Sequence, residues 1–315
     1  MHNAHGQVTR NTEQGMHDLS ILIVTRDRPD DLERCLASVF RPVNVSFEVV
    51  VVDNASSDAR VAAVLRRYPG VRVVHLPRNY GDWEGRDIGR LQCDAPYILS
   101  LDDDAELSPG AAEELLEVAR SNPNLAVVQP RVLEPLRRPG VVLGTPHDTS
   151  FPHLVGGFLG GACLLRAKAL HEAGGFPHFW LGGAEPFLSL RFLDLGYDMV
   201  FWPGATIMHW ASQANRVAWH RSYFASAGRI RAIVRNEPRV FHRLAHVFWK
   251  PLACSLACVR RRHFAAAMVS LLPLYAIGVK ELFSRPLSNA QAIRRSFFLR
   301  KNVVAFTVRQ CGWRQ

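Results

Sequence analysis

The 315-residue sequence has six cysteines, and no two of them form a Cys-x-x-Cys pair. Zinc sites and disulfide frameworks need paired or regularly spaced cysteines, so we expect reduced thiols in a cytoplasmic protein. The sequence also lacks a glycine-rich phosphate loop of the Gly-x-Gly-x-x-Gly or Walker type after its first predicted strand. A phosphate-bearing ligand would therefore be held by a metal ion and side chains.

Long apolar runs are missing too. Residues 1–18 have no apolar core, so we expect a flexible tail and no signal peptide there. The apolar run 264–279 contains Pro273 and Gly278, and it falls short of the about 20 residues that a membrane-spanning helix needs. The sequence therefore predicts no helix that crosses a membrane.

Acidic residues are scarce in the last third of the chain. Residues 211–315 contain 19 lysines and arginines but only two acids, Glu237 and Glu281, whereas residues 1–210 hold 26 acids and 19 bases. The net charge of +10 thus combines an acidic body with a basic tail.

The body has the pattern of an α/β domain. Apolar, β-branched runs at 19–25, 47–53, 71–76 and 95–101 alternate with helical patterns, except that a polar, glycine-bearing segment occupies 78–93. Further strands are expected at 125–133, within 156–166 and at 196–203, and a proline-rich surface loop at 137–152. This order predicts a largely parallel sheet flanked by helices.

The acidic run Asp102-Asp103-Asp104 directly follows the fourth predicted strand. Alternation along a strand would place Asp102 and Asp104 on one side and Asp103 on the other. Such paired carboxylates suit Mg²⁺ or Mn²⁺ shared with a substrate diphosphate. The alternative is an acidic turn before a helix that Ser108 caps.

Two other strand ends are polar: Thr25 with Arg26, and Asp53 with Asn54. In an open α/β sheet, ligands bind at the carboxyl edge of the strands, where a carboxylate such as Asp53 could accept hydrogen bonds from a base or ribose. A lone aspartate in this position is otherwise a helix cap.

Glu185 stands before Pro186, which suits the first turn of a helix, so we expect Glu185 at the cap site. Glutamate is an unusual cap, and the helix N-terminus would favour its ionised form, as a general base requires. A surface glutamate is the alternative. His209, at the end of another apolar run, is either a metal ligand or a structural histidine.

Together these blocks resemble the inverting family 2 nucleotide-sugar glycosyltransferases of the GT-A fold. The resemblance covers about 19–210 and rests on Thr25, Val52-Asp53-Asn54, Asn79-Tyr80-Gly81 to Gly89, Leu101 to Asp104, Gly174-Gly175-Phe176, Glu185 to Arg191, and Pro203 to His209. It implies a catalytic domain at 19–212, with the basic helical region 213–315 as an extension.

The resemblance also implies residue roles. Asp102, Asp104 and His209 would bind Mn²⁺ or Mg²⁺, and Glu185 would be the catalytic base. Donor-binding residues would be Thr25, Arg26, Asp53, Asn54, Arg86, Asp87, Asp102 and Asp103, and acceptor-side residues Trp180, Gly182, Gly183 and Arg191. The chain departs from the family at Ala184-Glu185, where a Glu-Asp pair is common, and at Asp87, where an Asn is common.

The basic region alternates aromatic and basic residues over 219–262. This composition favours helices that lie on an anionic membrane, at the inner face of the plasma membrane. The alternative is a helical lid that packs on the sheet. We expect no nucleic-acid partner, since that would leave the acidic strand ends without a role.

Three hypotheses follow. The first is transfer of a sugar from a UDP- or dTDP-linked donor to a lipid-linked or cell-envelope glycan. The others are transfer to a soluble natural product, and a non-catalytic protein that binds nucleotide sugars.

Overall fold

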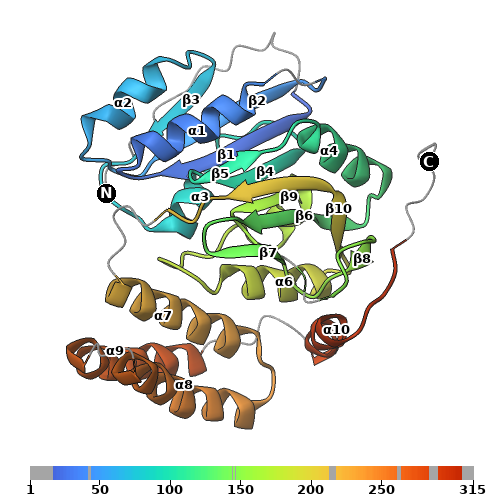
Figure 1. The fold of residues 1–315 in the computed structure, drawn as a ribbon. Coiled ribbons are helices and arrows are strands. Elements are labelled where there is room, and N and C mark those ends of the chain that lie inside the picture. Colours follow the sequence, from blue (N-terminus) through green and yellow to red (C-terminus); the bar gives the residue numbers. More distant parts are fainter. Residues whose placement is uncertain are drawn as a thin grey trace, which may run out of the picture.

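The computed structural model describes residues 17–41, 44–143, 145, 147–212, 218–260, 264–283 and 290–306 (Figure 1). The tail expected at 1–18 lies outside these residues except for its last two. Within them, the predicted α/β fold with flanking helices is confirmed.

The elements follow one another in this order. The first part contains β1 (Leu19–Thr25), α1 (Pro29–Val39), β2 (Phe47–Asp53), α2 (Ala59–Arg66), β3 (Val71–His75), α3 (Asp82–Arg90), β4 (Tyr97–Asp102) and β5 (Ala105–Leu107). The middle part contains α4 (Ala111–Ser121), β6 (Leu125–Glu134), β7 (Arg138–Leu143), β8 (His153–Leu154), β9 (Ala162–Arg166), α5 (Ala167–Glu172), α6 (Ala184–Asp194) and β10 (Asp198–His209). The last part contains α7 (Ala218–Asn236), α8 (Val240–Arg260), α9 (Phe264–Leu282) and α10 (Ala290–Lys301).

The sheet has the strand order β3-β2-β1-β4-β9-β6-β10-β5, with β7 paired to β6 and β8 to β10. Strands β3, β2, β1 and β4 are parallel, as predicted, because a helix connects each to the next in sequence. The prediction of a largely parallel sheet does not hold further along. No crossover helix lies between β6 and β9, so β9 runs antiparallel to both of its neighbours and the whole sheet is mixed.

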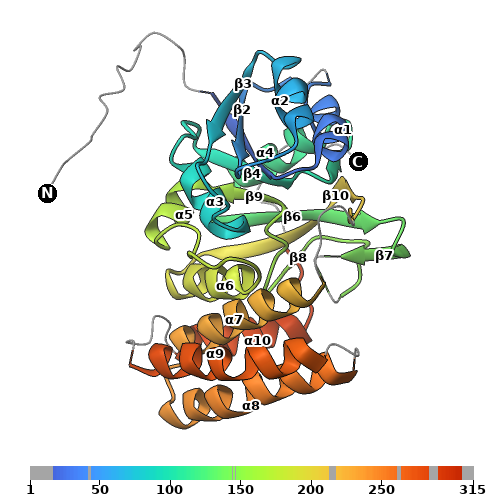
Figure 2. The ribbon, with the colours of Figure 1, turned by 90° about the vertical axis from the view of Figure 1, so that its left-hand side faces the viewer.

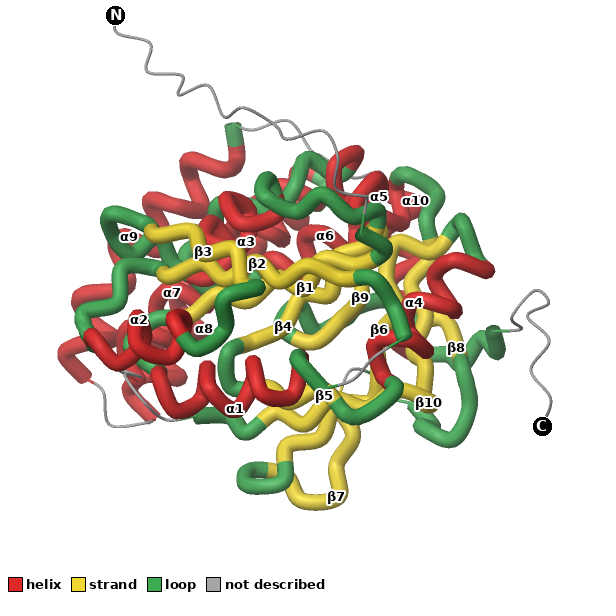
Figure 3. Tube along the Cα trace, turned by 90° about the horizontal axis from the view of Figure 1, so that it is seen from above, coloured by secondary structure: helices red, strands yellow, loops and turns green. Residues whose placement is uncertain are grey.

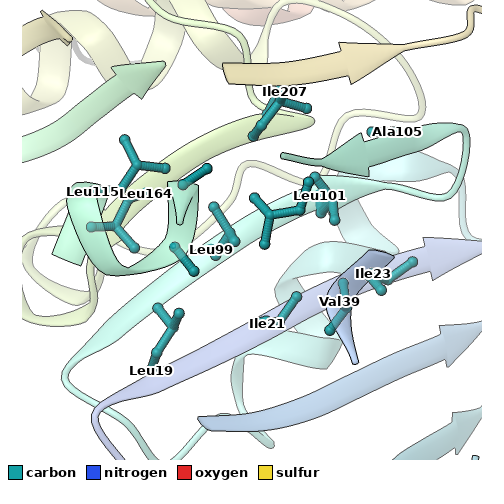
Figure 4. Close-up of a cluster of buried hydrophobic side chains, with 14 of the residues drawn as sticks. Leu19, Ile21, Ile23, Val39, Leu99, Leu101, Ala105, Leu115, Leu164 and Ile207 are labelled. Carbon is teal, nitrogen blue, oxygen red and sulfur yellow. The ribbon is translucent and has the colours of Figure 1, made fainter. Parts of the chain in front are cut away.

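Both faces of the sheet are covered by helices (Figure 3). Alternate residues of β1 belong to two apolar clusters, one on each face of the sheet. In the first cluster, Ile21 and Ile23 pack with α1, α2 and α4; in the second, Leu22 packs with α3, α5 and α6. Figure 4 shows part of the first cluster, in which Ile23 and Val39 lie beside Leu101 and Ala105. Burial on both faces explains why these strands are apolar throughout.

Helices α7, α8 and α9 form a layer beyond α6, which we call the helical layer (Figure 2). It has a small core of its own, made of Ala227, Ile230, Val234, Val247 and Leu274. The chain then returns to the sheet. Ala292 and Leu299 of α10 join the core beneath α6, and Ala305 bridges to His153 of β8.

No helix in the described ranges has a stretch long and apolar enough to cross a membrane. The arginine run 260–262 of the basic region lies outside the described residues after Arg260.

Two local predictions are wrong, and one segment had no assigned element. The polar segment 78–93, for which the sequence predicted no helix or strand, contains α3, and the expected loop 137–152 contains β7. Helix α4 begins at Ala111 with Gly110 as its N-cap, so Ser108 does not cap it. The sequence pattern did not indicate that α3 packs on the sheet, because glycine stands at position 89, where an apolar side chain would normally face the sheet.

Gly89 yields a test of this packing. A Cβ atom at Gly89 would lie 2.5 Å from Leu22 and 2.6 Å from Val52, so Gly89→Ala should lower the free energy of unfolding by about 1–2 kcal/mol, despite alanine's higher helix propensity. Urea unfolding measures this. The control is Gly70→Ala, whose Cβ atom would lie 3.7 Å from Phe40 and should change stability by less than about 0.5 kcal/mol. Equal stability of the two variants would contradict this packing.

Candidate active site

Three potential metal ligands meet where β4 ends. Asp102 is the last residue of β4, Asp104 lies in the turn before β5, and β5 pairs antiparallel with the end of β10, which carries His209. His209 Nε2 lies 3.1 Å from Asp104 Oδ1 and 3.8 Å from Asp102 Oδ2. The last described strand of the chain, β10, thus places a histidine beside an acidic turn 105 residues earlier in the sequence.

The donor set of these three residues fits a divalent cation. One ligand atom from each of Asp102, Asp104 and His209 lies within 4.8 Å of the others. The second ring nitrogen of His209, Nδ1, lies 2.8 Å from Glu134 Oε1, which fixes the ring. Burial disfavours a charged ring, but hydrogen bonds to Asp104 and Glu134 and the charge of Asp102 raise the pKa of His209 to about 9. In the metal-free site, an imidazolium therefore supplies positive charge among the carboxylates.

Asp103 points away from this cluster. It accepts hydrogen bonds from Thr25 Oγ1 at 2.8 Å and from Arg28 Nη1 at 2.9 Å. Burial and the nearby charge of Asp104 raise the pKa of Asp103 to about 6, although Arg28 opposes this. Thr25 and Asp103, both predicted as donor-binding residues, thus hold each other at the carboxyl ends of β1 and β4.

Arg86 lies beneath Asp102 and is 1% exposed. Its guanidinium donates to Ser100 Oγ at 2.8 Å and to Asp82 at 3.1 Å, and it also pairs with Asp102. Burial disfavours its charge, but these two carboxylates raise the pKa of Arg86. Arg86 therefore orients the first aspartate of the acidic run from below.

Asn54 and Asp87 are occupied by loop contacts. The side-chain amide of Asn54 donates to Gly81 O at 2.7 Å and accepts from Tyr80 N at 2.8 Å, which shapes the turn before α3. Asp87 pairs with Arg90 and accepts from Phe176 N at 2.8 Å. Both predicted donor-binding residues thus hold segments of backbone beside the site.

The remaining donor-side residues lie at the carboxyl ends of β1 and β2. Asp53 is opposite Thr25 in the sheet register and accepts from Ser56 N at 2.9 Å. Arg26 is half exposed, and its Nε lies 3.5 Å from Ala55 O.

Glu185 lies in the first turn of α6, but not at the cap position that the sequence predicted. Gly183 is the N-cap, with the left-handed φ of 81° that glycine tolerates, and the helix begins at Ala184. Burial raises the pKa of Glu185 to about 7, and the charges of Asp82 and Asp102 add to this effect. The helix N-terminus, which we expected to favour ionisation, is therefore outweighed by burial.

One cavity of about 940 Å³ joins the two parts of the site. Its walls include both Asp102 and Glu185, together with Asp82. Gly161 lets the wall approach this closely, because a Cβ atom there would collide with the carboxylate of Asp102. Asp102 of the cluster and the candidate base therefore line a common cavity.

The predicted acceptor-side residues separate into two groups. Gly182 and Gly183 line the cavity and lie against α7, where a Cβ on Gly182 would be 3.1 Å from Ala225 Cα. Trp180 stacks on Phe224 of α7 with ring centroids 5.1 Å apart. Arg191 is not among the cavity residues, and its Nη1 lies 3.0 Å from Asp194.

Three site residues were not identified from the sequence: Arg28, Asp82 and Glu134. Arg28 contacts the acidic run, and Glu134 contacts His209. In each case the two partners are 75 residues apart in the sequence, so no local pattern reveals the contact. Asp82 was detectable in principle. It follows Gly81, whose φ of 83° marks a turn, and it opens α3 at the same sheet edge.

The mixed sheet, the Asp-x-Asp turn at the end of β4 and a glutamate that shares a cavity with Asp102 are typical of the GT-A glycosyltransferase fold. Two solved structures share the fold. "GalNAc-T7 with UDP, GalNAc and Mn2+" superposes with a TM-score of 0.57 at 15% identity, over 71% of this chain and about half (49%) of that one. The mannosyltransferase PcManGT from Pyrobaculum calidifontis, in complex with GDP-Man and Mn²⁺, gives 0.56 at 16% identity, over 85% and 88%.

Sequence comparisons agree with this fold. Residues 20–170, just under half of the chain, match the family model described as glycosyl transferase family 2. A pre-mycofactocin glycosyltransferase of Mycobacterium tuberculosis is 24% identical over 93% of this chain and 68% of its own length. An N-acetylglucosaminyl-diphospho-decaprenol L-rhamnosyltransferase of the same organism is 26% identical over 61% of this chain and 75% of its own length.

The ligand cluster predicts a stabilising response to metal. Saturating Mn²⁺ should raise the melting temperature of the protein by roughly 2 °C or more, because an ion that binds only the folded state stabilises it. Asp104→Asn and His209→Gln should abolish this rise in a thermal-shift titration.

The control for this titration is Glu106→Gln, which removes a carboxylate two residues from Asp104 that is not part of the cluster. It should keep the full response. A Mn²⁺ response that persists in Asp104→Asn would show that the ion binds elsewhere.

Proposed function

We propose that this protein is a metal-dependent, inverting glycosyltransferase. It would move a sugar from a UDP- or dTDP-linked donor to a hydroxyl of a lipid-linked or cell-envelope glycan. The observation that carries the proposal is the shared cavity: Asp102 of the metal cluster and Glu185 line it together. The two Mn²⁺-containing structural neighbours and the rhamnosyltransferase relative support the donor and acceptor classes.

On the donor side, Asp102, Asp104 and His209 would hold Mn²⁺ or Mg²⁺, which supplies positive charge to the diphosphate as it leaves. Arg86 keeps Asp102 in place, and Glu134 keeps the His209 ring in place. Asp53, at the carboxyl end of β2, would accept hydrogen bonds from the nucleoside, alongside Thr25 and Asp103.

On the acceptor side, Glu185 would take the proton of the attacking hydroxyl. That oxygen forms the bond to the anomeric carbon while the bond to the nucleotide diphosphate breaks on the opposite face, so one displacement inverts the configuration. The pKa of about 7 suits a general base, since the carboxylate is half ionised near neutral pH yet basic enough to accept a proton. Glu185 would act as the base alone, because Ala184-Glu185 stands here in place of the Glu-Asp pair that is common in the family.

The base is tested by Glu185→Gln, which keeps the shape of the side chain and removes its basicity. We expect the transfer rate to fall by about 10²–10⁴-fold while the donor dissociation constant stays unchanged. The control is Glu84→Gln on α3, which is not among the cavity residues. Undiminished turnover in Glu185→Gln would refute the assignment and would leave a binding-only protein or another base.

The pH dependence follows from the same residue. The base must be ionised, and burial raises its pKa to about 7, so kcat/KM should increase with pH and level off above about 7. The profile is measured with saturating Mn²⁺. A rising limb centred near the ordinary value of 4.5 would mean that Glu185 is not the group that titrates.

We also propose that the helical layer lies against an anionic membrane. Its outer surface exposes large apolar side chains: Val240, Phe241, Leu244, Phe248, Trp249, Leu252 and Leu256 on α8, and Leu272, Val279 and Phe283 on or just after α9. The only two acids of the basic region are buried, and they pair with arginines: Glu237 with Arg239, and Glu281 with Arg235. The described outer surface thus combines exposed aromatic residues with basic side chains and shows no exposed carboxylate, which fits an anionic lipid surface.

Vesicle sedimentation tests this surface. The protein should bind vesicles that contain phosphatidylglycerol more tightly than neutral phosphatidylcholine vesicles, and added salt should weaken the binding. The double variant Phe248→Ser/Trp249→Ser should bind at least about tenfold more weakly. Leu136→Ser, which removes an equally exposed apolar side chain on the β6–β7 turn, is the control.

If the wild type does not bind either kind of vesicle, transfer to a soluble acceptor becomes the better hypothesis. The pre-mycofactocin glycosyltransferase, whose similarity extends over 93% of this chain, favours that second candidate.

A further inference from the structure

The cavity that contains Asp102 and Glu185 also has three arginines in its wall. Arg138 comes from β7, Arg229 from α7 and Arg300 from α10. Two of these elements lie beyond the part of the chain that matches the family model, which ends at residue 170. Arg229 and Arg300 are therefore contributed by the basic C-terminal region, whereas Arg138 belongs to the matched part.

Arg300 lines the cavity, and a hydrogen bond holds its side chain there. Its Nε donates to Gly156 O at 3.2 Å, and its Nη2 would lie 3.0 Å from a Cβ atom on Gly157. The glycine pair at 156–157 thus makes room for the guanidinium. Partial burial lowers the pKa of Arg300, although part of the residue stays exposed.

Arg229 reaches the cavity because α7 lies directly on the turn before Glu185. A Cβ atom on Gly183 would lie 2.8 Å from Arg229 N, which places the start of this side chain beside the N-cap of α6. The backbone of Arg229 therefore lies beside the turn that precedes the candidate base, and Arg229 is one of the residues that line the cavity.

Neither arginine is neutralised by the protein. Most other described arginines of the helical layer pair with a carboxylate, as Arg231 and Arg235 do with Glu281. In contrast, no carboxylate of the described residues lies within 4.0 Å of the guanidinium nitrogens of Arg138, Arg229 or Arg300. The cavity also has apolar wall residues, among them Val142, Leu143 and Leu181.

We infer that the acceptor is an amphiphilic anion, and that Arg229 and Arg300 bind a phosphate or carboxylate on it while its hydroxyl faces Glu185. This inference rests on the proposed function, since it takes the cavity as the acceptor site. Guanidiniums form charge-assisted hydrogen bonds with such anions, which are stronger than neutral ones and need no metal. Arg138, on the rim strand β7, adds to the positive potential.

Three synthetic probes test the inference: phenyl β-D-glucoside, its 6-phosphate, and phenyl β-D-glucuronide. They share a ring and a sugar and differ only at carbon 6. Calorimetric titration is done in EDTA, so that no metal ion can hold the phosphate. The wild type should bind at least one charged probe roughly tenfold more tightly than the neutral glucoside, and the better of the two identifies phosphate or carboxylate as the recognised group.

Arg229→Gln and Arg300→Gln should each remove this preference, and Arg294→Gln should preserve it. Arg294 is the matched control because it is an exposed arginine of α10 that is not among the cavity residues. If either glutamine variant fails to fold, the corresponding lysine variant replaces it and should keep most of the preference, since it keeps the charge.

Equal binding of all three probes by the wild type would overturn the inference. So would a loss in Arg294→Gln as large as that in Arg300→Gln. The donor affinity, measured separately with UDP-sugars and Mn²⁺, should be the same in wild type and variants, and a parallel tenfold loss there would place the arginines at the donor diphosphate instead. If no nucleotide sugar binds the wild type, the proposed function fails, and the probe contrast still reports on the arginines alone.

Discussion

The rest of the site depends on the ion pairs and hydrogen bonds that the buried guanidinium of Arg86 makes. The guanidinium lies between α3 and β4, where it pairs with Asp82 and Asp102 and donates to Ser100. Asp102 and Asp82 face the cavity together with Glu185, so three carboxylates share one partly enclosed space. Without a buried cation beneath them, their mutual repulsion would be uncompensated, and breaking such a buried pair is strongly destabilising.

A second cationic side chain lies beside the carboxylates of Asp102 and Asp104. It is His209, whose raised pKa keeps the ring charged beside Asp104 in the metal-free protein. A divalent ion would take over the same function and would require His209 in its neutral form. Binding of a metal ion would thus replace the positive charge of the protonated ring and would keep the aspartates paired.

The features predicted from the sequence are those that a local residue pattern determines. The buried strands were found because their residues are apolar on both faces. Asp102 and Asp104 were selected because they follow a buried strand, whereas the choice of His209 as a ligand came from the family resemblance. The errors came from contacts that no local pattern encodes. Gly85 and Gly89 weakened the helical signal of α3, although Gly89 is small because Leu22 and Val52 press against it. Similarly, Asn54 was expected to contact the donor, but its amide is used to hold the backbone of residues 80 and 81.

The return of the chain to the sheet after α10 has a consequence for engineering. Because β10 leads into the helical layer and Ala305 bridges back to His153, the layer is an insertion anchored at both ends. A protein shortened after β10 would lose Arg229 and Arg300 from the cavity wall together with the layer. Conversely, a grafted layer from another enzyme could change acceptor choice while the donor chemistry is kept, provided that small residues are retained where Ala225 and Gly228 meet the Gly182-Gly183 turn.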